Sequence, residues 1–531
     1  MAAAGGGEGA RRRRRWMSAA AGAWVQCSSG SSYCFSVYSP LLKASQSYSQ
    51  STLDSVAFFK DVGANVGVLS GLLQSSCGPS AVLAAGAAQC LAGYLLIWAS
   101  VAGVLPRPPP ALMCVYMLLA AQAQTFFNTA DVVTAVENFP GYRGTVIGIM
   151  KGFLGLSGAI LIQIYRTVFN GNPSSFLLML ALVPSILPLL MMYFIRVYPD
   201  ANGEDDGRGL DAFSLIAMTT AAYLMIVIIG EAVFTLGLPV RILALVVLLI
   251  LLVSPLAVVY KAQLSESSKT QVDETSSCHD TERTACRKQL VSPDCDQEVP
   301  FLLPREESLN LLQAMGTCNF WLLFVAMACG MGSGLATVNN MGQIGSSLGY
   351  SSKATSILVS LWSIWNFLGR FGSGYVSDYT LRLHGWARPL FMVITLGVMS
   401  VGHVIISSDL PGSLYVGSVL VGVCYGSQWA LMPSITSELF GLRHFGTIFN
   451  SVAIASPVGS YILSVKVVGS IYDSEASSTG VCTGRNCFML SFLIMALFAL
   501  LGVAVSLALF FRTRRFYKQV ILARVQNSAL Q

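Results

Sequence analysis

Residues 144–158 read GTVIGIMKGFLGLSG, and the Gly-Thr that opens this segment returns as Gly446-Thr447, 302 positions later in a chain of 531 residues. Further matches have the same offset: Gly30 with Gly332, Tyr48-Ser49 with Tyr350-Ser351, and Gly67 with Gly369. Chance matches would not share one offset across several hydrophobic segments, so this self-similarity marks an internal repeat. We therefore expect two halves that begin with the same structural pattern.

Composition and block length place this repeat in a membrane. The chain is 54% hydrophobic and 11% charged, whereas an average soluble domain carries about 25% charged residues. Its apolar residues form blocks of about twenty, the length that a helix needs to cross a bilayer. Because no alternating strand pattern is present, helices are the spanning structure that satisfies every backbone hydrogen bond. The expected spans are 20–42, 55–75, 80–104, 111–136, 145–166, 175–196, 211–233, 239–260, 318–340, 353–376, 389–407, 412–432, 445–466 and 488–511.

The repeat and the spans together predict an all-α polytopic membrane protein. Two six-helix bundles related by an axis along the membrane normal are the architecture of major facilitator transporters, whose substrate site lies at the midplane between the halves. Two extra central helices and a polar stretch account for the rest of the repeat offset. The expected divisions are a basic cytosolic tail (1–19), a first bundle (20–197), a loop with the extra helix pair (198–260), a cytosolic disordered linker (261–312), a second bundle (313–511) and a cytosolic tail (512–531).

Basic residues predict the orientation, because Lys and Arg near span ends are retained on the cytosolic side. With the amino terminus inside, most of the 32 basic residues fall on that side, so both termini are expected to be cytosolic. The alternative that Arg11–Arg15 opens a cleaved signal peptide is disfavoured, because Gln26 and the serines after it are too polar for its apolar core. The choice between plasma membrane and vacuolar membrane stays open.

Cysteine usage argues against a disulfide framework, because the 13 cysteines are odd in number and most lie in spans or in the linker. Cys482 and Cys487 are the exception. Both fall in the non-cytosolic loop before the last span, where an oxidising environment would permit a local disulfide. Cys278, Cys286 and Cys295 have spacings that match no compact zinc motif, so no metal site and no cofactor are expected.

A second mark of the transporter architecture is Gly374-Tyr375-Val376-Ser377-Asp378, which resembles the Gly-x-x-x-Asp cytosolic loop of that superfamily. A glycine lets two helices approach, and Asp378 with Arg382 and Arg388 would form ion pairs that hold a cytosolic gate. The equivalent loop of the first half, 71–80, has neither acid nor base, so such a latch would be one-sided. The alternative is that these charges lie in a solvated loop and contribute little.

Two further connections repeat an acid and a base, Glu137 with Arg143 and Glu438 with Arg443. Their equivalent positions in the two halves favour structural gating pairs over substrate contacts.

Longer strings carry a family resemblance. They are FKDVGANVG at 59–67, NNMGQIG at 339–345, SLGY at 347–350 and SIWNFLGR at 363–370. Together these resemble the plant nodulin-like family of the major facilitator superfamily, the group that includes proteins named for nuclear fusion defects. The resemblance covers about residues 20–511 without the linker, and it extends remotely to monocarboxylate and oxalate/formate carriers. It implies transport more firmly than it implies a particular substrate.

Charged residues within spans are the strongest site candidates, because each costs about 2.5–3.5 kcal/mol on insertion scales and normally faces a cavity or a partner. Lys60 and Asp61 point about 100° apart on one helix, so we expect that they do not neutralise each other. Asp131 and Lys151 lie at similar distances from the turn near Pro140, which allows either an ion pair or a binding role. Lys151 is the best single candidate for attracting an anionic substrate.

Uncharged polar residues in the spans complete the candidate site. Each one alone is more often an interhelical hydrogen bond than a ligand, but the cluster is informative. The candidates are Asn65, Asn128, Asn339, Asn340, Gln343, Asn366 and Gln428.

These features favour a secondary active transporter that moves a small polar or anionic solute by alternating access, with proton coupling left open. Its expected partners are the lipid bilayer and the solute, with no nucleic acid. The rival hypothesis is a receptor or scaffold that retains the transporter fold without transport, because fold alone does not prove function. A membrane enzyme ranks third, because no His/Asp cluster or nucleophile constellation appears at the span ends.

Overall fold

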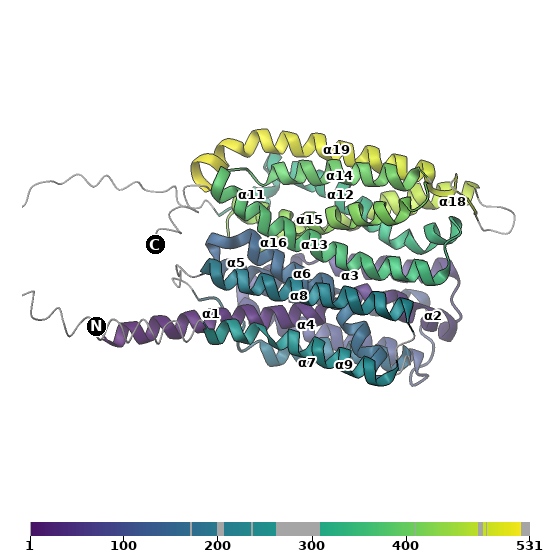
Figure 1. Cartoon of the computed structure of the whole chain (residues 1–531), viewed down its shortest axis with the longest axis horizontal. Coiled ribbons are helices and arrows are strands. Elements are labelled where there is room, and N and C mark those ends of the chain that lie inside the picture. Colours follow the sequence, from purple (N-terminus) through teal and green to yellow (C-terminus); the bar gives the residue numbers. More distant parts are fainter. Residues whose placement is uncertain are drawn as a thin grey trace, which may run out of the picture.

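The computed structural model describes residues 2–169, 173–198, 206–234, 237–261, 308–408, 410–475, 482–484 and 486–521. Most of the expected linker, with Cys278, Cys286 and Cys295, lies outside these residues. The long helices run roughly parallel to one axis, and α1 begins at the same end of the bundle at which α19 ends (Figure 1). We call this end the terminal face and the other end the opposite face.

The first half and the extra pair contain helices joined by short connections. Their bounds are α1 Ala2–Ser29, η1 Ser31–Cys34, α2 Phe35–Gln46, α3 Gln50–Asn65, α4 Val68–Val101, α5 Pro110–Asn138, η2 Pro140–Tyr142, α6 Arg143–Val168, α7 Pro173–Met191, α8 Asp206–Val233 and α9 Leu238–Val253.

The second half repeats this pattern with more interruptions. Its elements are α11 Leu311–Met315, α12 Cys318–Ser347, α13 Ser352–His384, α14 Pro389–Ser407, α15 Ser413–Phe440, α16 Phe445–Ala453, α17 Ala455–Ser460, the π-helix η4 Tyr461–Gly469, α18 Ser470–Glu475, α19 Asn486–Phe516 and the π-helix η5 Tyr517–Ile521.

The membrane spans match the predicted fold class. Eleven helices among the described residues are long and apolar enough to cross a bilayer. One stretch, Ser55–Val101, holds two of the expected spans, because α4 turns back at Gly78, whose φ of 77° suits a glycine. The α1–α2 segment and α13 complete the two six-span bundles, and both carry polar residues at mid-length. The all-α major facilitator fold with an extra helix pair is confirmed.

The halves meet along two seams that the repeat relates to each other. At one seam α4 packs on α16, and at the other α6 packs on α13. Glycines allow the close approach, since a Cβ on Gly446 would lie 3.5 Å from Gly71 Cα and a Cβ on Gly374 would lie 2.8 Å from Gly148 Cα. The second span of each half therefore contacts the fifth span of the other half.

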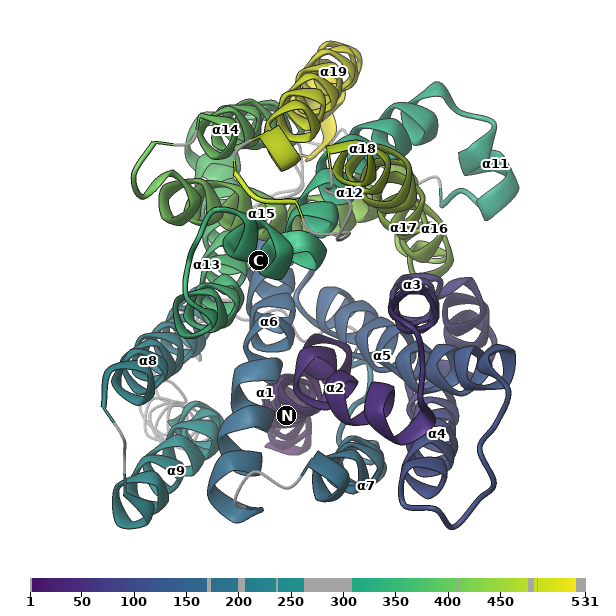
Figure 2. The same cartoon turned by 90° about the vertical axis from the view of Figure 1, so that its right-hand side faces the viewer.

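The amino-terminal segment differs from the expected tail, because α1 is helical from Ala2 and its side chains are buried from Arg15 onward. Arg15 binds Asp206, and Trp16 lies 4.8 Å from the Phe139 ring and 5.7 Å from the Phe213 ring. These contacts fix α8 to the first half. The view in Figure 2 shows α8 and α9 at one side of the bundle, where α8 packs on α6 and α13.

Replacing Gly374 with valine is expected to separate α6 from α13, because the new side chain would overlap the backbone of Gly148. We expect a clear loss of thermal stability, of the order of 1–3 kcal/mol, as overpacking of a tight contact typically costs. Gly372→Val is the matched control, since no atom lies within 4 Å of the position of its Cβ. Equal melting temperatures for the two variants would contradict the tight seam.

Candidate functional site

A cavity of about 210 Å³ lies between the two halves. Its wall is formed by η1, α2, α3, α5 and α6 of the first half and by α12, α13, α15 and α16 of the second. Seven of the residues expected from the sequence line it: Lys60, Asp61, Asn65, Asn128, Lys151, Asn339 and Asn366. A group of aromatic side chains shares the wall: Tyr33, Phe35, Trp362, Tyr425, Trp429 and Phe449.

Arg370 is the most constrained cation in this cavity. Its Nε donates to Asn366 Oδ1 at 2.7 Å, Nη1 donates to the Lys151 carbonyl at 3.0 Å, and Nη2 donates to the Tyr33 hydroxyl at 3.0 Å. Its guanidinium carbon also lies 5.7 Å from the centre of the Trp429 ring. A guanidinium has five N–H donors, so this one can still donate to an anion in the cavity while both halves hold it in place.

Lys151 is buried in the first-half wall and faces two aromatic rings of the second half. Its Nζ lies 4.9 Å from the Trp429 ring centre and 4.7 Å from that of Phe449. Ring faces attract a cation weakly compared with a carboxylate. Among the described residues neither Lys151 nor Arg370 forms an ion pair with an acid. The cavity therefore presents two cations whose charge is not neutralised, which suits an anionic ligand.

Lys60 and Asp61 correct an argument made from the sequence. The prediction that these neighbours would not neutralise each other is wrong, because Lys60 Nζ lies 2.9 Å from Asp61 Oδ1. The flexible four-carbon stem of lysine bends across the angle between the two positions. Asp61 also reaches the other half, since Asn339 donates to its Oδ2 at 3.0 Å. The pair closes the wall and adds no net charge.

The expected pairing of Asp131 with Lys151 is absent among the described residues. Asp131 Oδ2 accepts a hydrogen bond from Gln26 of α1 at 3.0 Å, and Lys151 faces the cavity. Met150 explains the difference. The Met150 sulfur and the Asp131 side chain both lie beside Gly22, so Met150 is the residue of α6 that faces Asp131. Lys151 is the next residue and therefore points about 100° away from that carboxylate.

Three other candidates lie outside the cavity wall. Asn340 donates to Ser464 Oγ at 2.8 Å, Gln343 is exposed beyond the cavity, and Gln428 is buried against Met399. They occupy the right helices but the wrong faces.

Arg370 was missed as a site residue, because a long side chain near the end of the expected span 353–376 would be able to reach the membrane interface. In fact α13 continues to His384, so Arg370 lies within the helix and is 1% exposed. The available signal was Asn366, four residues earlier. Positions i and i+4 share a helix face, and both residues face the cavity.

Below the cavity, Asp378 closes the terminal face by binding the start of α6. Its Oδ1 accepts from the Gly144 amide at 3.1 Å and its Oδ2 accepts from the Thr145 amide at 2.5 Å. A carboxylate at a helix N-terminus satisfies free N–H groups and complements the helix dipole. Asp378 of the second half therefore caps a helix of the first half.

Arg388 supports this cap from behind. It binds Asp378 and places its Nε 2.7 Å from Glu438 Oε1, and Glu438 Oε2 accepts from the Tyr517 hydroxyl at 2.8 Å. Burial alone would lower the pKa of the Arg388 guanidinium, but Glu438 and Asp378 together raise it above its ordinary value. Asp378 and Arg388 are buried and in contact, which excludes the solvated-loop alternative for both.

The remaining gate candidates have different positions. Arg143 donates to the Ser437 carbonyl at 3.0 Å, and Arg382 donates to the Gly141 carbonyl at 2.6 Å, so both cross between the halves. The expected pairing of Glu438 with Arg443 is wrong, because Glu438 binds Arg388 and Arg443 is exposed. Glu137 is half-buried at the end of α5.

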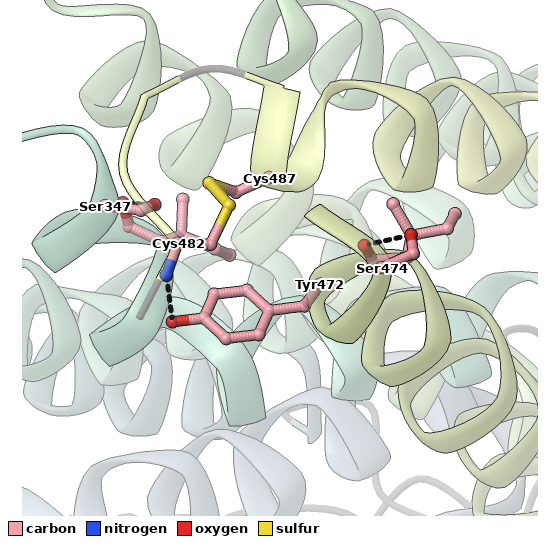
Figure 3. The surroundings of a disulfide bond; sticks show 7 residues. Ser347, Tyr472, Ser474, Cys482 and Cys487 are labelled. Carbon is pink, nitrogen blue, oxygen red and sulfur yellow. Dashed lines mark hydrogen bonds between the residues drawn. A yellow bond between two sulfur atoms is a disulfide. The ribbon is translucent and has the colours of Figure 1, made fainter. Parts of the chain in front are cut away.

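The opposite face carries a disulfide between Cys482 and Cys487 (Figure 3). The Cys482 amide donates to the Tyr472 hydroxyl at 3.3 Å, and the Gly484 amide donates to the Ser347 carbonyl at 2.9 Å. The short described segment 482–484 is thus tied to α18, to α12 and to the start of α19.

Comparisons with known proteins agree with this architecture. Residues 15–260 match a family model described as Nodulin-like, and residues 306–519 match one described as NFD4, C-terminal domain. Protein NUCLEAR FUSION DEFECTIVE 4 of Arabidopsis thaliana is 29% identical over 95% of this chain and 90% of its own. Probable transporter MCH1 of Candida glabrata is 26% identical over 34% of this chain and 39% of its own.

A solved structure shows the fold alone. The proton:xylose symporter XylE of the major facilitator superfamily superposes with a TM-score of 0.55 at 13% identity, covering 93% of this chain and 94% of its own.

Replacing Asp378 with asparagine is expected to weaken closure of the terminal face by roughly 3–5 kcal/mol, because it leaves Arg388 with one fewer buried partner. Closure can be measured by the reaction of a cysteine introduced at buried Ser437 with an impermeant thiol reagent. The background replaces the exposed Cys77 and Cys318 with serine, together with Cys278, Cys286 and Cys295 of the linker. Asp211→Asn, at an exposed residue of α8, is the control. Identical labelling rates in both variants would argue against the cap.

Proposed function

We propose that the chain, whose first half matches a Nodulin-like model and whose second half matches a model of the NFD4 C-terminal domain, is a nodulin-like member of the major facilitator superfamily and a secondary active transporter of a small organic anion. The observation that carries this proposal is the pair of cations, Lys151 and Arg370, that face a cavity between the halves without an acidic partner among the described residues. Burying a charge is costly unless it is paired. A substrate carboxylate would supply the missing partner.

Alternating access is the mechanism that the seams support. The terminal face is closed by the Asp378 cap and by glycine contacts at both seams. On the other side of the cavity the halves meet through the hydrogen bond from Asn339 to Asp61 and through the rings of Phe58 and Tyr461, 5.5 Å apart. We propose that the halves rock about the cavity, so that the terminal face opens as these lighter contacts tighten.

We propose that the terminal face is cytosolic. Arg11–Arg15 of α1 and the arginines in the last turn of α19, Arg514 and Arg515, lie at that face, as the retention of positive charge on the cytosolic side requires. The disulfide lies at the opposite face, which suits an oxidising compartment. Both termini would then be cytosolic, and the solute would exchange between the cytosol and that compartment.

The rival function, a receptor without transport, drew support from the uncharged loop at 71–80. The structure weakens that support, because Gly71 packs directly on the backbone of Gly446 and Thr447 and needs no charge to do so. A carrier rather than an enzyme is proposed, because the groups that line the cavity are suited to holding an anion.

Uptake into proteoliposomes of labelled mono- and dicarboxylates of two to six carbons tests the proposal. We expect saturable counterflow of at least one anion. Lys151→Ala should raise its half-saturating concentration about 10- to 100-fold, because a hydrogen bond to a charged group contributes roughly 1.5–3 kcal/mol. Arg370→Lys keeps the positive charge but loses the planar guanidinium that can donate two parallel hydrogen bonds. It should weaken anion binding less than Arg370→Ala.

Lys466→Ala is the matched control, because Lys466 is an exposed cation outside the cavity. No counterflow of any anion by folded protein, or equal effects of Lys151→Ala and Lys466→Ala, would refute the proposed carrier.

A further inference from the structure

Asp131 and Gln26 form a buried pair that the proposed binding of an anion does not use. Asp131 is 2% exposed and Gln26 is fully buried. The Gln26 amide donates from Nε2 to Asp131 Oδ2 at 3.0 Å. The other oxygen of each group, Asp131 Oδ1 and Gln26 Oε1, is buried and has no hydrogen-bond partner. When Asp131 is ionised, Asp131 Oδ1 and Gln26 Oε1 are both hydrogen-bond acceptors. Neither can donate to the other, so the pair lacks a donor.

No neighbouring cation compensates the carboxylate. Asp131 forms no ion pair within the described ranges. Charged and titratable groups on the helices packed on α5 have other partners. Arg15 binds Asp206, Tyr33 binds Arg370, and Lys60 and Asp61 bind each other. Arg143 donates to Ser437, Lys151 lines the cavity, and Arg166 binds Glu231. The described α4 and α16 contain no charged residue.

We propose that Asp131 and Gln26 are a proton-binding site of the carrier, in which a proton on Asp131 supplies the donor that the pair lacks. This inference rests on the proposed transport function and names its coupling ion. A protonated carboxyl and a primary amide can each present one donor and one acceptor side by side on a planar group. The acid O–H then donates to the amide oxygen while the amide N–H donates to the acid carbonyl. Both unpartnered atoms are satisfied by one proton.

The pair lies next to the elements that hold the anion site. On α5, Asn128 lines the cavity three residues before Asp131. On α1, Gln26 lies four residues before Gly30, where the chain enters η1. That turn supplies Tyr33, whose hydroxyl accepts from Arg370 at 3.0 Å. When the proton is lost, Asp131 Oδ1 and Gln26 Oε1 are two acceptors that repel each other. This repulsion favours movement of α1, and the movement carries Tyr33 away from Arg370.

Proton and anion movement are thereby linked. One proton is taken up on the side from which the anion enters and is released on the side to which the anion leaves. Each transport step therefore moves one negative charge fewer than the anion alone would move.

Infrared difference spectroscopy of the full-length purified protein detects the proton without any substrate. In a Glu137→Gln background, which removes the half-buried carboxyl six residues along α5, we expect the carbonyl band of a protonated carboxylic acid near neutral pH, and we expect Asp131→Asn to abolish it. We also expect the wild-type melting temperature to fall as the pH rises, because the native state then loses a proton that the unfolded chain has already lost. Absence of the band, or its persistence in Asp131→Asn, overturns the proposal.

Gly22 offers a matched pair of variants in case Asp131→Asn fails to fold. A Cβ at Gly22 would lie 3.6 Å from Asp131 Oδ1, an ordinary contact. Gly22→Ser adds a hydroxyl that can donate to Oδ1 and replace the proton, whereas Gly22→Ala adds only the methyl group. The band should be lost in the serine variant and retained in the alanine variant. Equal bands in the two variants overturn the proposal.

The coupling itself is tested with whichever carboxylate of the uptake panel is carried. An inward proton gradient should accelerate its uptake by wild type, whereas uptake by Asp131→Asn should proceed at the same rate with and without the gradient. Equal acceleration in both proteins refutes the coupling. If no carboxylate is carried, the proposed transport fails, but the infrared result still decides whether Asp131 binds a proton.

Discussion

The close approach of α6 to α13 is the contact on which the arrangement of the cavity depends. Gly148 and Gly374 have no side chains, so the helices meet backbone to backbone. One turn farther along, this proximity lets Arg370 of one half donate to the Lys151 carbonyl of the other. The two cations are therefore neighbours because the backbones touch. A wider seam would leave each of them in a separate wall, and neither half alone would form a site for an anion.

The two seams are related by the repeat but differ in chemistry. Where α4 meets α16, Gly71 rests against Gly446 and Thr447, and the contact is packing alone. Where α6 meets α13, Asp378 caps α6 and is backed by a buried arginine. Both contacts are buried, so salt screens neither of them strongly, but removal of one partner costs more at the charged cap than at the glycine contact. The two seams thus close the same face by different means.

The sequence sufficed for the two halves and the spans, because hydrophobic length and a shared offset follow directly from chain order. It also named Lys151 and Asn366 as candidates, and both line the cavity. Prediction from the sequence failed where contacts depended on the side of a helix to which a side chain points. Asp131 and Lys151 share a depth, but their helices turn them to different sides. Lys60 and Asp61 pair because the long lysine side chain bends toward its neighbour. The angle between two positions on a helix does not predict such bending. Arg370 was misplaced because α13 extends past the apolar block that marked its end.

The attachment of the extra helix pair has a consequence for how the protein sits in lipid. Trp16, held between Phe139 and Phe213, and the bond from Arg15 to Asp206 join α8 to the first half. That half with its added pair has the broader perimeter in the bilayer, and viscous drag on a membrane-embedded body grows with its perimeter. When two such bodies turn against each other, the narrower one covers the larger angle. The second half, which carries Arg370 and Asp378, would then turn through the larger angle.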